Sequence, residues 1–183
     1  MVWLGVWLAA LPPPGAAWQR VQSGDTVIDC ATVDGVPWCR ATAWLDATPE
    51  RAAALLLDLP GHPRVFPRVA SSDELRPGLA HQVLRLPPPL APRDVVVALS
   101  HTVEGQDHVI RFDSVDRPDI PSPGVRLTRY AGEFRLHPEQ GGVRLTYTWE
   151  AELGVEVPAF ALSTAWRLEG NEIVDGLRAA LAP

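Results

Sequence analysis

The chain of 183 residues is 46% hydrophobic and 21% charged, which suits one globular domain with a single core and excludes a disordered chain. Its formal net charge is -6 at pH 7, and all 16 basic residues are arginines. Because these arginines form no basic cluster and do not alternate with aromatic residues, we expect no nucleic-acid partner.

The N-terminus has the pattern of a secretory signal peptide. An apolar run of suitable length ends near Leu11, and the small residues Gly15-Ala16-Ala17 form a cleavage pattern before Trp18. The run is too short to span a membrane. It lacks the positive residues that usually begin a signal peptide, so an uncleaved apolar tail is the alternative. We predict a signal peptide at residues 1–17, a single domain at 18–183, and a periplasmic or secreted protein.

A tight hairpin is predicted around Asp34-Gly35, the dipeptide preferred in two-residue type I′ turns. Counting outward from this turn places Cys30 opposite Cys39, at a position without inter-strand hydrogen bonds, where side chains come closest. Pro37 falls at another such position, where its missing N–H is not needed. The register predicts a disulfide in an oxidising compartment, with two buried free thiols as the alternative.

A short helix is expected after this hairpin. Thr48 can cap it, Pro49 suits its first turn, and Glu50 complements the positive end of the helix dipole. Pro60-Gly61 ends it, and residues 62–69 then form a turn or a second short helix.

Two antiparallel hairpins are predicted next. Residues 69–75 and 80–86 form the first, and residues 93–103 and 108–115 form the second. Alternation along the second hairpin places six side chains on one face: Val95, Val97, Leu99, His101, Ile110 and Phe112.

The stretch from Val125 to Leu153 has the pattern of a wide aromatic hairpin. Both arms have period two: the alternate residues of the first arm run from Arg126 and Thr128 to Tyr130, Gly132, Phe134 and Leu136, and those of the second are Val143, Leu145, Tyr147, Trp149, Ala151 and Leu153. Residues 138–142 between the arms have the composition of a loop. The pairs expected on the aromatic face are Leu136 with Val143, Phe134 with Leu145, and Tyr130 with Trp149. The other face is polar, so the aromatic face requires a cover.

A long helix from about Pro158 to Leu181 can supply this cover. Its apolar stripe is formed by Leu162, Trp166, Ile173, Leu177 and Leu181. Gly170 interrupts the helix at a position where a kink is expected. The order of elements predicts an α+β helix-grip fold, in which a curved antiparallel sheet wraps around the C-terminal helix and leaves room for an apolar pocket.

The chain resembles the START family of steroidogenic acute regulatory protein-related lipid-transfer domains, within the Bet v 1-like (SRPBCC) helix-grip superfamily, as a bacterial member. The segments that carry this resemblance are ATPERAAALLLDLPGHPRVFPRV, LPPPLAPRDVVVALS, PSPGVRLTRYAGEFRLHPEQGGVRLTYTWEAEL and VPAFAL. Their order and spacing cover nearly the whole chain after residue 17. The resemblance implies a hydrophobic cavity for a lipid or another apolar small molecule, with the C-terminal helix and adjacent loops as a lid.

The predicted ligand-binding residues share the inward faces of the strands and of the last helix. They are Val97, Leu99, His101, Phe112, Arg126, Tyr130, Phe134, Tyr147, Trp149, Leu162, Trp166 and Ile173. For the aromatic residues, ordinary core packing is the alternative.

Polar residues expected among these inward faces include Asp73, Gln82 and Arg126. A buried arginine needs a partner, and Asp73 or another acid is a possible partner for Arg126. Such groups either orient the polar end of a ligand or form a structural network. The structural role is favoured for Arg93 and Asp94.

Signals for an enzyme are weak. The histidines lie at no zinc-ligand spacing, and neither a glycine-rich phosphate loop nor a nucleophile elbow is present, so no metal or cofactor is expected. The favoured hypothesis is an exported protein that binds a lipid or other apolar molecule, with transfer of that molecule during transient membrane contact as an additional role. A cyclase- or hydrolase-like enzyme using His101 with Tyr130 or Asp73 is the alternative.

Overall fold

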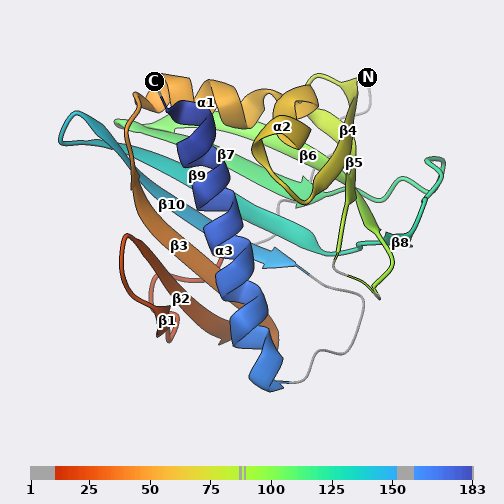
Figure 1. The fold of residues 1–183 in the computed structure, drawn as a ribbon, viewed down its shortest axis with the longest axis horizontal. Helices are drawn as coiled ribbons and strands as arrows, with labels where there is room; N and C mark the ends of the chain where they lie inside the picture. The colour runs from red at the N-terminus through yellow and green to blue at the C-terminus, as the bar shows by residue number, and fades with distance from the viewer. Residues whose placement is uncertain (1–10, 87, 89, 152–158, 183) are drawn as a thin grey trace.

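A computed structural model describes residues 11–86, 88, 90–151 and 159–182, and gives no side-chain positions for residues 151–162. It confirms the predicted α+β helix-grip fold: one long helix crosses a curved antiparallel sheet on one face (Figure 1). The first ten residues, which hold most of the predicted signal sequence, lie outside the described part of the chain.

Ten strands form a single sheet in the described part of the chain. They are β1 (Gln19–Gln22), β2 (Thr26–Val33), β3 (Val36–Leu45), β4 (Val69–Arg76), β5 (Leu79–Leu84), β6 (Arg93–Glu104), β7 (Asp107–Ser114), β8 (Val125–Arg126), β9 (Tyr130–Glu139) and β10 (Gly142–Ala151). The order across the sheet is β1-β2-β3-β10-β9-β7-β6-β5-β4, and β8 pairs in parallel with β6. The first and second halves of the chain therefore meet where β3 pairs with β10.

Short helices connect β3 to β4, and a long one ends the chain. They are α1 (Pro49–Leu57), the 3-10 turn η1 (Leu59–Gly61), α2 (His62–Val65) and α3 (Ala159–Leu181). The predicted cap is present, because the Arg51 amide donates to Thr48 Oγ1 at 3.2 Å. Among the described residues, none of the helices combines the length and the apolar character needed to cross a lipid bilayer.

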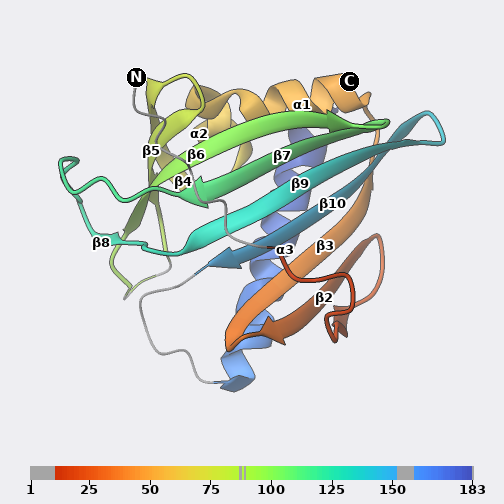
Figure 2. The ribbon, with the colours of Figure 1, turned by 180° about the vertical axis from the view of Figure 1, so that it is seen from behind.

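The core lies between α3 and the inner face of the sheet. Val174, Leu177 and Leu181 of α3 are buried there, with Ile28 of β2 and Trp149 of β10. The view from behind shows the opposite face of the sheet, with α3 lying beyond the strands (Figure 2). The sheet thus has one face covered by a helix and one face of mixed polar residues, as the alternation of its strands predicts.

Two glycines let α3 approach its neighbours closely. A Cβ on Gly170 would come within 2.9 Å of Ile28 and 3.0 Å of Trp149, and one on Gly176 would come within 2.3 Å of the Val65 carbonyl oxygen. Gly170, where a kink was predicted, therefore has a packing role, and α3 runs through it as one helix.

The predicted register of the N-terminal hairpin is confirmed. Val33 pairs with Val36, and Cys30 lies opposite Cys39 with Cα atoms 4.1 Å apart, joined by a disulfide. Both cysteines are buried on the inner face, and Cys39 is also the β3 partner of Trp149. The bond is compatible with an oxidising compartment.

Replacing both cysteines with alanine is expected to lower the free energy of unfolding by about 2–3 kcal/mol, since the bond closes a short loop. Urea denaturation of the variant and of the oxidised wild type measures the difference. Wild type reduced before unfolding provides the control and should lose a similar amount. Equal denaturation midpoints for the three samples would contradict a stabilising role for the bond.

The first arm of the predicted aromatic hairpin is wrong in its first residues. Residues 125–136 were expected as one strand, but β8 ends at Arg126 and β9 begins at Tyr130. Val125 and Arg126 instead pair with Arg93 and Asp94 at the start of β6. A parallel pairing between segments about 30 residues apart overrides the local alternation.

The register of the aromatic hairpin also differs from the prediction. Strands β9 and β10 continue to a two-residue turn at Gln140 and Gly141, which have φ values of 52° and 79°. Leu136 therefore pairs with Leu145 and Phe134 with Tyr147, a shift of two positions from the predicted pairs. Since side chains alternate with period two, the shift leaves every residue of the β9–β10 pairing on its predicted face.

Candidate functional site

The inner face of the sheet carries a row of stacked aromatic rings on three adjacent strands. Phe134 of β9 stacks on Tyr147 of β10 with ring centroids 4.4 Å apart and planes inclined by 10°. Tyr147 stacks in turn on Trp149 at 4.5 Å and 8°. Phe112 of β7 contacts Tyr130 at 5.0 Å and Phe134 at 5.6 Å. Cross-strand pairing and strand alternation together build this row.

The inner rings differ in how much solvent-accessible surface they retain. Tyr147 and Trp149 are almost completely buried, whereas Tyr130 and Phe134 remain partly accessible. On α3, Trp166 and Ile173 also pack against the core cluster and remain partly accessible. Partly accessible apolar side chains between a sheet and its covering helix are what the lining of an apolar pocket would provide.

Three of the predicted ligand-binding residues on strands β6 and β7 have apolar surroundings. Val97 and Phe112 are buried in the core cluster, and Leu99 packs against it. Leu162 is also a predicted ligand-binding residue, but its side chain is not in the described part of the structure. Contact of any of these residues with a ligand stays a prediction.

A carboxyl group on α3 faces the aromatic row. Burial raises the pKa of Glu169 to about 7, a change opposed by Arg68 and by a hydrogen bond from Trp149 and reinforced by Glu172. Arg68 is bound to Glu172 through two contacts, Nε to Oε2 and Nη2 to Oε1, the second at 3.1 Å. The Arg68 charge is therefore largely matched by Glu172. Near neutral pH the Glu169 carboxyl group is protonated in a substantial fraction of the molecules.

Sequence reasoning missed Glu169. The sequence does contain an indication of its role. Glu169 lies on the apolar stripe of α3, three residues after Trp166 and four before Ile173, so all three side chains share one helix face. A charged residue at such a position is unusual for a face that packs on a core.

Two tyrosine hydroxyls complete the polar part of this interior. Burial is the largest cause that raises the pKa of both Tyr130 and Tyr147, so both are neutral at physiological pH. The Tyr147 hydroxyl is buried and has no hydrogen-bond partner in the described part of the chain. The Tyr130 hydroxyl is a hydrogen-bonding neighbour that changes its pKa, but the geometry between the two hydroxyls falls short of a normal hydrogen bond.

Three of the polar residues predicted for the interior lie elsewhere. His101 is exposed and stacks on His108 with ring centroids 5.1 Å apart, because it lies near the solvent end of the β6–β7 hairpin. Asp73 is exposed on β4, an edge strand of the sheet. Arg126 lies on β8, outside the aromatic face. The structure therefore does not bring His101 and Asp73 to Tyr130, and the acid–base set considered for an enzyme is not assembled.

Arg126 belongs to a buried network around Asp94. Its Nε donates to Asp94 Oδ2 at 2.6 Å, and its two terminal nitrogens donate to the carbonyls of Arg117 and Ile120. Asp94 also accepts from the Ser122 hydroxyl, and His81 Nε2 lies 2.9 Å from its Oδ2. Asp94, not Asp73, is the partner of Arg126, and the network joins β5, β6, β8 and the loop before β8.

Gln82 belongs to a second buried polar group. It contacts His62 Nδ1 at 2.9 Å and donates to Ser72 at 3.0 Å, while His62 Nε2 lies 2.9 Å from the Leu56 carbonyl. Burial lowers the pKa of His62. This group holds α2 on β4 and β5, which indicates a structural role.

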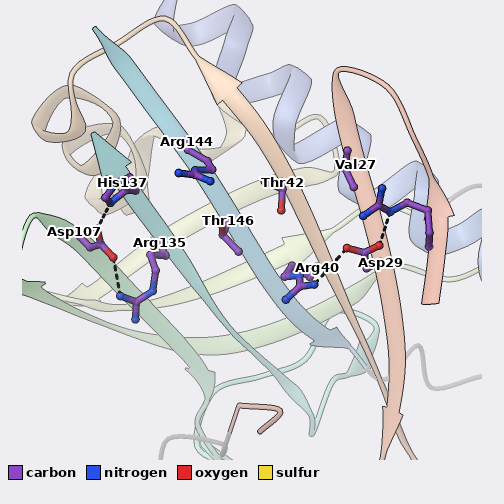
Figure 3. Close-up of a pocket in the computed structure, with 10 residues that line it drawn as sticks. Val27, Asp29, Arg40, Thr42, Asp107, Arg135, His137, Arg144 and Thr146 are labelled. Atoms are coloured by element: carbon purple, nitrogen blue, oxygen red, sulfur yellow. Dashed lines mark hydrogen bonds and ion pairs between the residues drawn. The ribbon is translucent and has the colours of Figure 1, made fainter. Parts of the chain in front are cut away.

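A groove of about 590 Å³ lies on the opposite, outer face of the sheet (Figure 3). It is lined by Arg20, Val27, Asp29, Arg40, Thr42, Asp107, Arg135, His137, Arg144 and Thr146. Each basic side chain in it has an acidic partner: Asp29 binds Arg20 and Arg40, Asp107 contacts Arg135 and His137, and Glu139 binds Arg144. Compensated charges of this kind suit a solvated sheet face and not an apolar ligand.

The described residues contain no cluster of three or more histidine, cysteine or acidic side chains that could hold a metal ion. The polar groups that face the aromatic row can accept and donate hydrogen bonds, and Glu169 can exchange a proton near neutral pH. The chemistry of this interior is thus apolar contact with a small hydrogen-bonding end.

Residues 39–182 match the family model described as polyketide cyclase / dehydrase and lipid transport. No curated protein matches the chain. Among solved structures, the STAR-related lipid transfer protein from Xanthomonas axonopodis is 22% identical, with a TM-score of 0.78, over 90% of this chain and 98% of that one. The lipid transfer and protein localization domain of human StarD13 is 18% identical, with a TM-score of 0.79, over 92% of this chain and 90% of that one. Human StAR-related lipid transfer protein 5 is 15% identical, with a TM-score of 0.77, over 91% of this chain and 87% of that one. At these identities the likeness establishes the shared fold.

Proposed function

Because the chain belongs to the polyketide cyclase / dehydrase and lipid transport family, we propose that it binds a lipid or another apolar small molecule between its sheet and α3 and carries it outside the cytoplasm. The observation that carries this proposal is the partial accessibility of Tyr130, Phe134, Trp166 and Ile173, although all four pack against the core cluster. Three of the similar structures are lipid transfer proteins or domains by name, which agrees with it.

The location follows from two features of the N-terminal part of the chain. The disulfide between Cys30 and Cys39 needs oxidising conditions to persist, and the sequence before Trp18 has a signal-peptide pattern. A carrier in that location would exchange its ligand during transient contact with a membrane. Native mass spectrometry of protein isolated from the periplasm tests ligand and processing together: the expected mass is that of residues 18–183 plus a bound lipid.

A substitution that fills the proposed pocket should abolish binding. In Ile173→Trp, a larger ring enters the space between α3 and the sheet, and we expect at least a tenfold loss of affinity for an apolar fluorescent probe. Leu168→Trp is the matched control, because Leu168 on the same helix is 52% exposed. Titration of the probe into both variants, with circular dichroism to verify folding, makes the comparison. Unchanged binding by folded Ile173→Trp would count against an interior site.

A further inference from the structure

We propose that the polar end of the bound ligand is an uncharged hydroxyl group, held by Tyr130, Tyr147 and Glu169, and that this interior rejects a carboxylate. The inference rests on the proposed function, since it requires that an apolar ligand enters between the sheet and α3. It names the chemical class of that ligand.

The first argument is the unsatisfied hydroxyl of Tyr147. A buried polar group without a hydrogen bond is destabilising, and native proteins usually satisfy such groups with protein, water or ligand. In the described part of the chain this oxygen has no partner with normal hydrogen-bond geometry, and its contact with the Tyr130 hydroxyl falls short of one. Tyr130 and Glu169, the nearby polar groups that act on it, both keep accessible surface. A hydroxyl bound between Tyr130 and Glu169 would complete the hydrogen bonding of all three.

The second argument concerns a cationic ligand. Phe134 and Trp149 both stack on the Tyr147 ring, with centroids 4.4 Å and 4.5 Å away and planes inclined to it by 10° and 8°. Cation–π binding needs a ring face, where the negative charge of the π system lies. Between these two neighbours, the Tyr147 ring presents its edge, whose partial charge is positive. The stacked Tyr147 ring therefore does not offer a face to an ammonium group.

The third argument concerns an anionic ligand. The charged groups that act on Glu169 are Arg68, before β4, and Glu172, on α3 itself; on β9 and β10 it faces the neutral side chains of Tyr130, Tyr147 and Trp149. Arg68 is bound to Glu172 through two contacts. A ligand carboxylate would therefore meet a second carboxyl group and would have no free cation among these residues. Two like charges in a site of low polarity repel each other strongly.

A hydroxyl fits either protonation state of Glu169. It can donate to the ionised carboxylate, and it can accept from the protonated acid while donating to a tyrosine oxygen. A ligand with only an acceptor, such as a ketone, would lose its partner when Glu169 ionises. The hydroxyl is thus the polar end that this set of groups satisfies at every pH near neutrality.

Three probes with the same chain and different ends test the proposal: decanol, decanoate and decylammonium. At about pH 8, where Glu169 is mostly ionised, the full-length protein is expected to bind decanol at least about tenfold more tightly than decanoate; at about pH 5.5, where Glu169 is mostly protonated and cannot pair with an ammonium group, it is expected to bind decanol at least about tenfold more tightly than decylammonium. Displacement of an apolar fluorescent probe measures both. In Glu169→Gln the difference in affinity between decanol and decanoate should become smaller, because the charge that repels decanoate is gone. Equal or tighter binding by the wild type of decanoate at about pH 8, or of decylammonium at about pH 5.5, would overturn the inference and leave the proposed function intact.

Tyr147→Phe separates a hydrogen-bonding role from a packing role. It removes one oxygen that has no partner in the described structure, so the melting temperature should stay the same or rise. The preference for decanol over decanoate should fall about fivefold to tenfold, the value of one hydrogen bond. A folded variant with the wild-type preference would overturn the inference. Failure of all three probes and of the apolar fluorescent probe to bind would instead overturn the proposed function, and the inference with it.

Discussion

Replacing Asp94 with alanine is expected to lower the free energy of unfolding by about 3–5 kcal/mol, the range for breaking a buried ion pair by removing one partner. The Asp94 side chain is fully buried, and it joins Arg126, His81 and the Ser122 hydroxyl. Burial raises the pKa of Asp94, but the hydrogen bonds from Ser122, His81 and Arg126 outweigh burial and lower it below its ordinary value. The carboxylate is therefore ionised at neutral pH, and its loss leaves the Arg126 charge without its partner.

Urea denaturation followed by circular dichroism measures this loss. Asp73→Ala is the matched control, because Asp73 lies directly opposite His81 across β4 and β5 but is exposed, and its removal should change stability by less than about 0.5 kcal/mol. A second readout is position-specific: losing Asp94 should loosen β8 and the residue after it, because the amides of Val125 and Leu127 donate to the backbone carbonyls of Pro92 and Asp94. Hydrogen exchange at those amides should accelerate. Equal stability of the two variants would show that the network contributes little.

The Asp94 network also explains why the sequence predicts some elements and not others. The N-terminal hairpin could be predicted to the residue because Asp34-Gly35 fixes its register locally, and the disulfide follows from that register. The break between β8 and β9 has no local signal. It depends on the contact between Arg126 and Asp94, which are 32 positions apart, and on the parallel pairing of β8 with β6 at the same place.

The aromatic hairpin shows a partial success of the same kind. Alternation correctly assigned Tyr130, Phe134, Tyr147 and Trp149 to the inner face, because a shift of two positions does not change the face of a strand. The turn was missed because Gln140 adopts a positive φ, which is uncommon for a residue other than glycine, asparagine or aspartate. Strand pairing over ten residues outweighs that local cost.

Within the candidate site, apolar positions could be predicted more readily than polar ones. Hydrophobic periodicity identifies a face, but it does not indicate how far along the face a residue lies. His101 has the correct alternation and still lies at the exposed end of its strand, whereas Glu169 breaks the pattern of α3 and faces the aromatic row. A charged residue on an apolar stripe is therefore the stronger indication of a site than a polar residue in a strand.

The burial of Glu169 should make the stability of the protein depend on pH near neutrality. Its pKa is raised from an ordinary value of 4.5 to about 7 in the folded protein, with burial as the main cause. Between these values the folded state binds more protons than the unfolded state, so the free energy of unfolding falls as pH rises. This contribution is fully present below about pH 4.5 and is lost above about pH 7, with a total of at most about 3 kcal/mol.

Glu169→Gln should remove that dependence. Glutamine keeps the size and the hydrogen-bonding capacity of the protonated acid but carries no proton that titrates. We expect the variant and the wild type to have similar stability at about pH 4.5, and the variant to be more stable at about pH 8, in denaturation experiments across this range. Glu172→Gln is the contrast, since it breaks the contacts with Arg68 and should be destabilising at pH 8. Parallel stability curves for wild type and Glu169→Gln would show that the carboxyl group is not held in a low-polarity interior, and would remove the repulsion on which rejection of a carboxylate ligand depends.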